Sequence, residues 1–214
     1  MKNSVELLGY YGSDETHALS AWTSTKRELN DDKRGRIDKL LRMLADNGHH
    51  TPFEKSALHF LVTSEVASHI HIIKHRIGVS VNAESARYKE LKDDRHYTPV
   101  DWPDELREDF EDHIHSTQVR YHRYVEELVA SGFTRARAKE SARFILPYAT
   151  QLTSDVMFNW RSFATFLGLR NTQHAQLEVR TIAKQMLSLI EAIPEQPFKL
   201  TIAAFREAGL LGES

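Results

Sequence analysis

Apolar positions recur along the chain with two periods, and each period predicts a different kind of element. Residues 33–46 repeat apolar side chains at steps of three and four, the spacing of one helix face. Residues 105–131 and 134–145 are also predicted to be helical, with Gly132 between them. The most regular stripe covers 175–193 and consists of Ala175, Val179, Ile182, Met186, Leu189 and Ile193. It predicts a helix whose apolar face is buried in the core or against another helix.

Other segments have the composition of β-strands. Residues 4–12 are an apolar run that ends in glycine, residues 56–65 place alternate apolar side chains on one face, and residues 148–158 are a third such segment. No linker, repeat or low-complexity tract divides the chain. The pattern therefore predicts an α+β fold in a single domain, residues 1–214.

Polar motifs indicate where several elements begin and end. The stretch 51–54, Thr-Pro-Phe-Glu, has the signature of a capping box. Residues 66–77 are predicted to form a buried helix that Gly78 ends. Asn159 is placed to cap a further helix. The polar stretch 90–104, which contains two prolines, is predicted to be a loop.

The composition is that of a soluble globular protein and excludes several kinds of chemistry. The net charge of −2 gives the 214-residue chain no overall attraction to nucleic acid. Its apolar runs are too short to span a membrane and its first residues lack the apolar core of a signal peptide, so a cytoplasmic location is expected. The absence of cysteine excludes disulfides, thiolate metal sites and thiol nucleophiles.

Twelve histidines raise the question of a metal site. His71 and His75 are four residues apart and would share a helix face, as zinc-binding pairs do. No third ligand is evident, so a polar or cofactor-contacting role is favoured and no metal is expected. His113 and His115 lie in an acidic segment and are predicted to be solvated.

The segment 74–88 combines cations with a glycine and small polar residues. Lys74, Arg76 and Arg87 could bind a phosphate through charge-assisted hydrogen bonds, supported by backbone N–H groups where side chains are small. A basic surface turn is the alternative. A nucleic-acid surface is disfavoured, because the basic run is short and acidic residues surround it.

Two further segments carry arginines in informative places. Arg161 and Thr165 would lie one turn apart on the helix that Asn159 caps, and Arg170 would end that helix, where a cation also suits the helix dipole. Arg143 precedes an apolar run, where a partly buried cation would need a partner such as an anion.

Together these motifs resemble the flavin-dependent thymidylate synthases. The family signature of Arg-His-Arg, seven or eight residues, Ser, and then Arg-Tyr corresponds to Lys74-His75-Arg76, Ser85 and Arg87-Tyr88. The stretches "HHTPFEK", "ARFILP" and "NWRSFATFLGLRNTQHAQLEVR" resemble its other blocks, in family order.

The resemblance implies an enzyme that methylates dUMP to dTMP, with methylenetetrahydrofolate as carbon donor and FAD, reduced by NADPH, as hydride source. It also implies a central antiparallel sheet, long core helices and a homotetramer with shared active sites. A reduced flavin can deliver hydride without a protein nucleophile, which agrees with the absence of cysteine. A nucleotide- or RNA-binding module without redox chemistry and a histidine-rich metallohydrolase are the alternatives.

The resemblance assigns roles position by position. Arg170 matches the arginine that contacts uracil and promotes its ionisation, a catalytic role. The remaining positions matched to dUMP binding are His71, Lys74, Glu84, Ser85, Ala86, Arg87 and Arg143. Those matched to FAD binding are Ser24, Thr51, Lys74, His75, Arg76, Glu84, Asn159, Arg161, Thr165 and His174.

Several positions depart from the family pattern. Lys74 replaces an arginine and so keeps the charge but loses the planar fork. His71 replaces a frequent glutamine, and Trp22 stands where arginine is usual. The usual Asn-Glu-x-Ser reads Asn-Ala-Glu-Ser, which leaves Ala83 or Glu84 to fill the acidic position.

Overall fold

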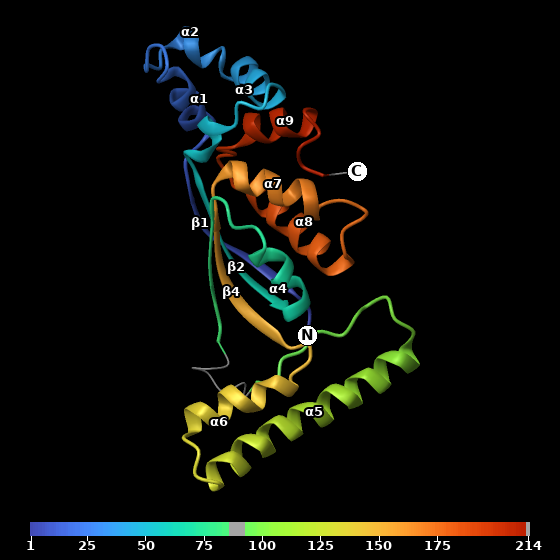
Figure 1. Cartoon of the computed structure of the whole chain (residues 1–214). Helices are drawn as coiled ribbons and strands as arrows, with labels where there is room; N and C mark the ends of the chain where they lie inside the picture. The colour runs from blue at the N-terminus through green and yellow to red at the C-terminus, as the bar shows by residue number, and fades with distance from the viewer. Residues whose placement is uncertain (86–92, 213–214) are drawn as a thin grey trace. The chain divides into compact units, whose positions relative to one another are not determined.

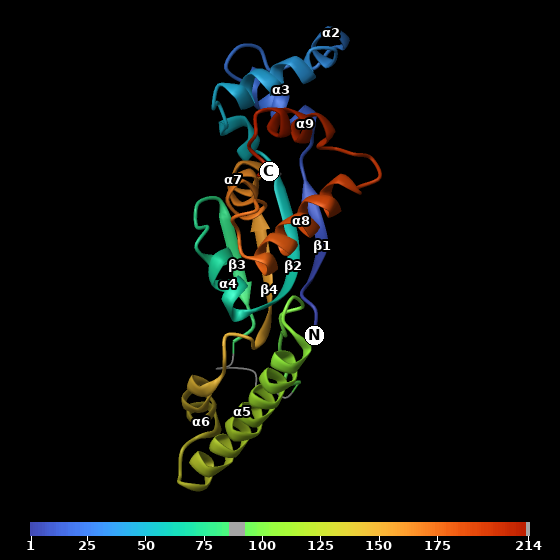
Figure 2. The same ribbon diagram turned by 90° about the vertical axis from the view of Figure 1, so that its right-hand side faces the viewer.

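The computed structural model describes residues 1–85 and 93–212. Within them, an antiparallel sheet has the strand order β1-β2-β4-β3 (Figure 1; all four strands are labelled in Figure 2). The strands are β1 (Ser4–Tyr11), β2 (Ala57–Glu65), β3 (Val79–Ala83) and β4 (Gln151–Phe158). The predicted α+β fold with an antiparallel sheet is confirmed.

Helices account for much of the rest of the described chain. They are α1 (Asp14–Trp22), α2 (Asp31–Arg34), α3 (Ile37–Asp46), α4 (Val66–Ile73), α5 (Asp104–Ala130), α6 (Arg135–Ala142), α7 (Trp160–Arg170), α8 (Leu177–Glu191) and α9 (Lys199–Glu207), with short 3₁₀ helices η1 (Thr51–Glu54) and η2 (Arg143–Ile145).

The residues group into two compact units. Unit 1 comprises Met1–Ser4, Thr63–Ile70 and Asn82–Ser154, and unit 2 comprises Val5–Val62, His71–Val81 and Asp155–Ser214. Strands β2 and β4 contribute residues to both units. The expectation of a single domain over 1–214 stays a prediction.

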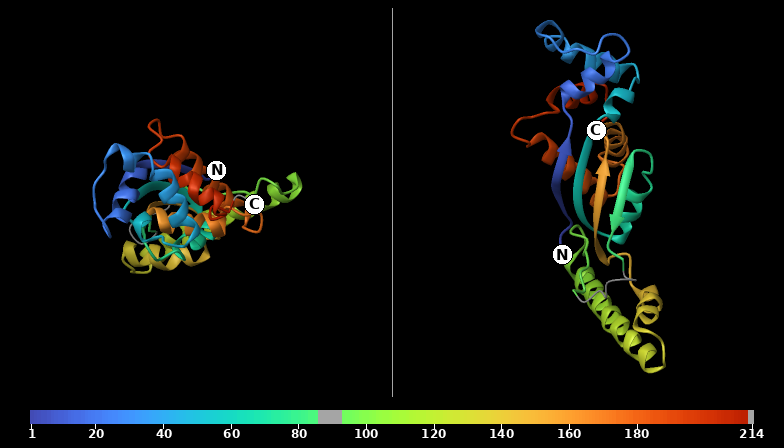
Figure 3. Two further views of the ribbon diagram at one scale, coloured as in Figure 1. Left: turned by 90° about the horizontal axis from the view of Figure 1, so that it is seen from above. Right: turned by 90° about the vertical axis from the view of Figure 1, so that its left-hand side faces the viewer.

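Residues of α1, α3 and α9 contribute to the core of unit 2, in which one face of the strands also packs against the helices α7 and α8. These helices lie side by side against that face in Figure 2, and the right panel of Figure 3 shows the strands from the opposite side. Alternation in β2 buries Leu58, Phe60 and Val62 completely, as the pattern predicts. Phe60 stacks on Phe163 of α7 with ring centroids 5.7 Å apart.

Most of the apolar stripe predicted over 175–193 is buried as expected, but Leu189 is only half-buried. Its members Val179, Ile182, Met186 and Ile193 are buried in the core, and Ala175 packs against the core. The helix itself is shorter than the stripe, since α8 spans Leu177–Glu191.

Unit 1 contains the paired helices α5 and α6, which lie side by side in Figure 1. Tyr121 and Val125 of α5 pack against Ala138 and Ala142 of α6. The predicted helices 105–131 and 134–145 are thus confirmed, the second with its last turn in η2 form. His113 and His115 of α5 are exposed, as predicted.

A buried polar chain lies in unit 2 and was not indicated by the sequence pattern. The ring of His17, fully buried, bonds Thr201 Oγ1 through Nδ1 and Ser56 Oγ through Nε2, both at 3.0 Å. Thr201 in turn donates to the Asp14 carboxylate at 2.6 Å. Burial lowers the pKa of His17 to about 3 and raises the pKa of Asp14.

Some predicted boundaries were wrong. The helix expected over 66–77 ends at Ile73, so His75 lies outside it and the proposed His71–His75 helix face does not form. The helix expected over 33–46 is divided, because α2 ends at Arg34 and α3 begins at Ile37.

The capping box proposed for 51–54 was also wrong. Thr51 is the first residue of η1, His50 takes the cap position, and no side chain there caps the helix. Glu54 instead pairs with Arg161. By contrast, Asn159 caps α7 as predicted, since its Oδ1 accepts the Ser162 N–H at 2.8 Å.

Elements without a strong local pattern were not predicted. Strand β3 is short and alternates half-buried with exposed residues inside a polar segment. Helix α1 has acidic and small residues, and Asp14 on it accepts the backbone N–H groups of Leu200 and Thr201 at the start of α9. Both helices therefore depend on a contact between distant parts of the chain.

Candidate functional site

The start of α7 is joined to a glycine turn that follows α4. Gly78 has φ +69, and its carbonyl accepts the Asn159 N–H at 3.2 Å and the Ser162 hydroxyl at 2.7 Å. A Cβ at residue 78 would lie 2.4 Å from Asn159 Nδ2. The position therefore requires glycine for both its backbone angle and its close approach.

This junction brings two distant stretches of sequence around one cavity of unit 2, which we call the α7 cavity. It has a volume of about 440 Å³ and is lined by Glu54, Lys74, His75, Arg76, Ile77, Asn159, Arg161, Ser162 and Thr165. Most of the positions matched to FAD binding are thus neighbours in space. Lys74, Arg76 and Arg161 are exposed there.

One of these cations is held by a carboxylate. Arg161 Nη1 lies 2.6 Å from Glu54 Oε1, which ties α7 to η1. Thr165 is one turn further along α7, and its hydroxyl donates to the Arg161 carbonyl at 3.0 Å. The predicted placement of Arg161 and Thr165 on one helix face is confirmed.

His75 joins the α7 cavity to Arg170 at the end of α7. The Arg170 Nε–H donates to His75 Nε2 at 3.3 Å, and the imidazole packs edge-on against Phe166 with centroids 5.1 Å apart. Burial lowers the pKa of His75, and the electrostatic interactions with Arg170 and His71 lower it further. A neutral imidazole whose Nε2 accepts a hydrogen bond is the form that fits this geometry.

Unit 1 contains a second cavity, which we call the Arg143 cavity. It measures about 500 Å³ and is lined by Val66, Glu84, Arg143, Phe144, Leu146, Pro147, Tyr148, Thr150, Gln151 and Leu152. Arg143 is half-buried, as predicted. Phe144 and Tyr148 are 80% and 67% exposed, so aromatic faces are available beside the charged groups. Glu84 and Arg143, both matched to dUMP binding, line the same cavity.

The other predicted site residues line neither cavity. Ser24, Thr51 and His174 are exposed in unit 2, and the Ser24 hydroxyl donates to the carbonyl of Ala21. His71 is half-buried on α4, and Ser85 is half-buried just after Glu84. Ala86 and Arg87 lie outside the described residues.

Sequence reasoning missed residues whose role depends on a partner in space. Glu54 and Arg95 each pair with a predicted site residue, Arg161 and Glu84 respectively. Neither lies in a periodic pattern, and Arg95 falls in a stretch predicted to be a loop. A search for opposite charges beside the candidate motifs would have included them among many others.

Residues 1–85 and 93–212 lack two features, a metal-binding cluster and a membrane-spanning helix. No group of three or more histidine, aspartate or glutamate side chains there is arranged to hold a metal ion. In the same part of the chain, no helix combines the length and apolar character needed to cross a membrane.

Comparison with known proteins gives consistent matches. The model of a family described as thymidylate synthase complementing protein matches residues 6–195. The flavin-dependent thymidylate synthase of Kosmotoga olearia is 27% identical over 205 residues, covering 89% of this chain and 86% of that protein. The enzyme of that name from Thermotoga neapolitana is 31% identical over 186 residues, covering 85% and 82%.

Solved structures agree with this match. A UMP/dUMP methylase from Streptomyces cacaoi, bound with 5-Br dUMP, has a TM-score of 0.78 and 26% sequence identity, covering 99% of this chain and 97% of that chain. The same methylase bound with 5-Br UMP has a TM-score of 0.76. The family match spans most of the chain and includes the described lining residues of both cavities. The chain therefore belongs to the thymidylate synthase complementing protein family, among whose relatives are the flavin-dependent thymidylate synthases named above.

Proposed function

We propose that this protein is a flavin-dependent thymidylate synthase that converts dUMP to dTMP. In the proposal, methylenetetrahydrofolate supplies the carbon and NADPH reduces FAD. The observation that carries it is the α7 cavity, where two motifs far apart in sequence, around His75 and around Asn159, meet. Family membership and the absence of cysteine support the same reaction.

The residues of the α7 cavity fit FAD. A dinucleotide carries a diphosphate and a planar ring, and so needs cations near an apolar surface. Lys74, Arg76 and Arg161 supply the cations, and Ile77, 89% exposed, supplies apolar surface. When bound, FAD would supply the hydride. The protein would supply the phosphate contacts and the neutral His75 beside them.

Arg170 is proposed to act on uracil. Its guanidinium stays charged at all relevant pH values and can stabilise the negative charge that develops when N3 of the ring loses its proton. The hydrogen bond to His75 and the position at the end of α7 hold the side chain in place.

Arg143 is proposed to bind the dUMP phosphate, with Ser85, Ala86 and Arg87 contributing from the motif that follows β3. A half-buried arginine at the edge of a cavity is suited to an anion, because charge-assisted hydrogen bonds are strongest where water is partly excluded. His71, Lys74, Ser24, Thr51, Thr165 and His174 remain proposed contacts by resemblance. The proposal includes a homotetramer with shared active sites and a cytoplasmic location.

Two measurements test the function. The purified protein is expected to show flavin absorbance and to form dTMP from dUMP, methylenetetrahydrofolate and NADPH. The gene is also expected to restore growth of a thymidine auxotroph without added thymidine. Colourless protein that binds nucleotide or RNA but forms no dTMP would favour the binding module, and zinc-dependent hydrolysis would favour the metallohydrolase.

UMP is a second candidate substrate. The observation that favours it is the similarity to a structure described as a UMP/dUMP methylase, with complexes of both 5-Br dUMP and 5-Br UMP. The same assay run with UMP in place of dUMP tests it, since the two differ only in the ribose 2′-hydroxyl. Product from UMP at a rate comparable to that from dUMP would widen the proposed substrate class.

A further inference from the structure

Glu84 and Arg95 form a largely buried ion pair at the end of β3 in unit 1. Arg95 Nη2 donates to Glu84 Oε2 at 2.5 Å, and the same oxygen accepts the backbone N–H of Thr153 at 2.9 Å. The Glu84 side chain is 25% exposed and the Arg95 side chain is 20% exposed. Removal of one partner would leave the other charge in a site with little water. This destabilises a protein more than the loss of a surface ion pair does.

The pair also fastens this segment to β4. Arg95 Nη1 donates to Thr153 Oγ1 at 3.2 Å, and the Glu84 N–H donates to the Thr153 carbonyl at 2.9 Å. Glu84 is therefore joined to one residue of β4 by its backbone and its carboxylate, and the guanidinium of Arg95 spans the two. Such paired contacts fix orientation as well as distance.

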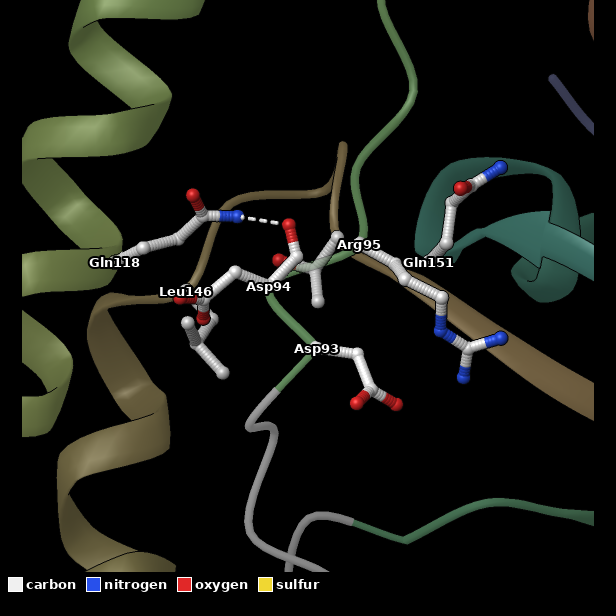
Figure 4. Close-up of a pocket in the computed structure, with 7 residues that line it drawn as sticks. Asp93, Asp94, Arg95, Gln118, Leu146 and Gln151 are labelled. Atoms are coloured by element: carbon white, nitrogen blue, oxygen red, sulfur yellow. Dashed lines mark hydrogen bonds between the residues drawn. The ribbon is translucent and has the colours of Figure 1, made fainter. Parts of the chain in front are cut away.

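The backbone that carries Arg95 is itself held in an unusual conformation. Asp94 has φ +45, a region that non-glycine residues rarely adopt. Gln118 of α5 donates to the Asp94 carbonyl at 2.7 Å, and His122 Nε2 lies 2.9 and 3.1 Å from the Asp94 carboxylate oxygens. Figure 4 shows Gln118 reaching this carbonyl from α5 while Arg95 extends away from that helix.

Glu84 lines the Arg143 cavity and is followed directly by Ser85. We infer that Arg95 is a positioning residue for the candidate nucleotide site, and that Glu84 acts through its bond to Arg95 rather than by contact with the ligand. The inference rests on the proposed function. Glu84, which is displaced by one position from the family pattern, thereby has a structural role at the edge of the Arg143 cavity.

The test measures dUMP binding by the flavin-loaded protein with Arg95→Ala, Arg95→Lys, Glu84→Gln and the double variant Glu84→Gln/Arg95→Ala. Arg95→Ala removes the charge-assisted hydrogen bond to Glu84 and is therefore expected to raise the dissociation constant for dUMP about tenfold or more. Arg95→Lys is expected to recover part of the affinity, because it keeps the charge. The double variant is expected to bind no more weakly than Arg95→Ala, since the two residues act as one unit.

Arg135→Ala is the matched control. Arg135 also pairs with a carboxylate in unit 1, Glu126 at 2.9 Å, but both side chains are about half exposed or more. This variant is expected to bind dUMP as the wild type does. Flavin absorbance and the melting temperature of each variant show whether it is folded and loaded.

Three outcomes would contradict these statements in different ways. Unchanged dUMP affinity in folded Arg95→Ala would overturn the inference and leave the proposed function standing. Additive losses in the double variant would show that Glu84 contacts the ligand independently, and would overturn the indirect role. Failure of the wild type to bind dUMP would overturn the proposed function, and the inference with it.

Discussion

His75 and Arg170 are joined by a hydrogen bond that assigns a protonation state to the histidine. The guanidinium can only donate, so His75 Nε2 must accept and the imidazole must be neutral. The direction of the His75 pKa shift agrees with this assignment. A neutral ring beside a permanent cation leaves Arg170 as the positive group available to a developing anion.

Replacement of Arg170 by alanine tests that role at the scale of one residue. Arg170→Ala is expected to lower the rate of dTMP formation by roughly 10²–10³-fold, the usual cost of losing one group that stabilises transition-state charge. Flavin binding is expected to persist, because Arg170 does not line the α7 cavity. Turnover within twofold of wild type at equal flavin content would remove Arg170 from the catalytic role. Lys74→Arg, which restores the family residue, is the control expected to remain active.

At the scale of elements, the turn at Gly78 and the cap at Asn159 form one joint. The Gly78 carbonyl accepts hydrogen bonds from the Asn159 N–H and the Ser162 hydroxyl, and Asn159 caps α7. This joint determines which residues of the two motifs line the α7 cavity together. A substitution at the joint therefore tests the cavity without changing a catalytic group.

Gly78→Ala is expected to destabilise the protein and weaken flavin binding. The new Cβ would meet Asn159 Nδ2 at 2.4 Å in a backbone conformation of φ +69. Gly48→Ala is the matched control, because Gly48 has the same φ of +69 but open space around its Cβ position. We expect Gly78→Ala to lower the free energy of unfolding by about 1–3 kcal/mol more than Gly48→Ala does, the range for overpacking. If denaturant titrations give the two variants the same free energy of unfolding, the clash at residue 78 is relieved without loss of stability.

Elements with a strong local pattern were predictable from the sequence, and the others were not. The stripe around Ile182 and the cap at Asn159 depend on spacing along the chain, and both predictions are confirmed. Strand β3 and helix α1 depend on contacts with distant segments, which no local pattern encodes. The candidate site shows the same division. Its motif residues could be predicted, whereas the partners Glu54 and Arg95 became evident from the fold.

At the scale of the whole molecule, the buried polar chain from Ser56 to Asp14 couples stability to pH. The folded His17 has a pKa of about 3, below the ordinary value of 6.5. The unfolded chain therefore takes up a proton between these values that the folded chain does not. The stability associated with His17 is fully present above about pH 6.5 and is lost as the pH falls toward 3. Burial raises the pKa of Asp14 above its ordinary value of 3.8. The stability associated with Asp14 therefore falls as the pH rises above 3.8, the opposite of the His17 effect.

Unfolding free energies measured from pH 7 to pH 4 test this coupling. The His17 shift corresponds to a loss on the order of 4–5 kcal/mol over its full range. His17→Gln is expected to be less stable at pH 7 and to show a shallower slope, because it removes the group that titrates. His113→Gln, on the exposed face of α5, is the control expected to keep the wild-type slope. An unchanged slope in His17→Gln would show that other groups cause the acid sensitivity.

The strand order β1-β2-β4-β3 also governs how the chain can fold during synthesis. Strand β2 pairs with β4, although residues 66–150 lie between them in the sequence. At roughly 5–20 residues per second, the ribosome needs on the order of ten seconds to deliver β4 after β2. During that interval the apolar face of β2, with Leu58, Phe60 and Val62, lacks the α7 and α8 surfaces that cover it later. Slowing translation between β2 and β4 is therefore expected to lengthen the exposure of this apolar face and to increase aggregation of the nascent chain.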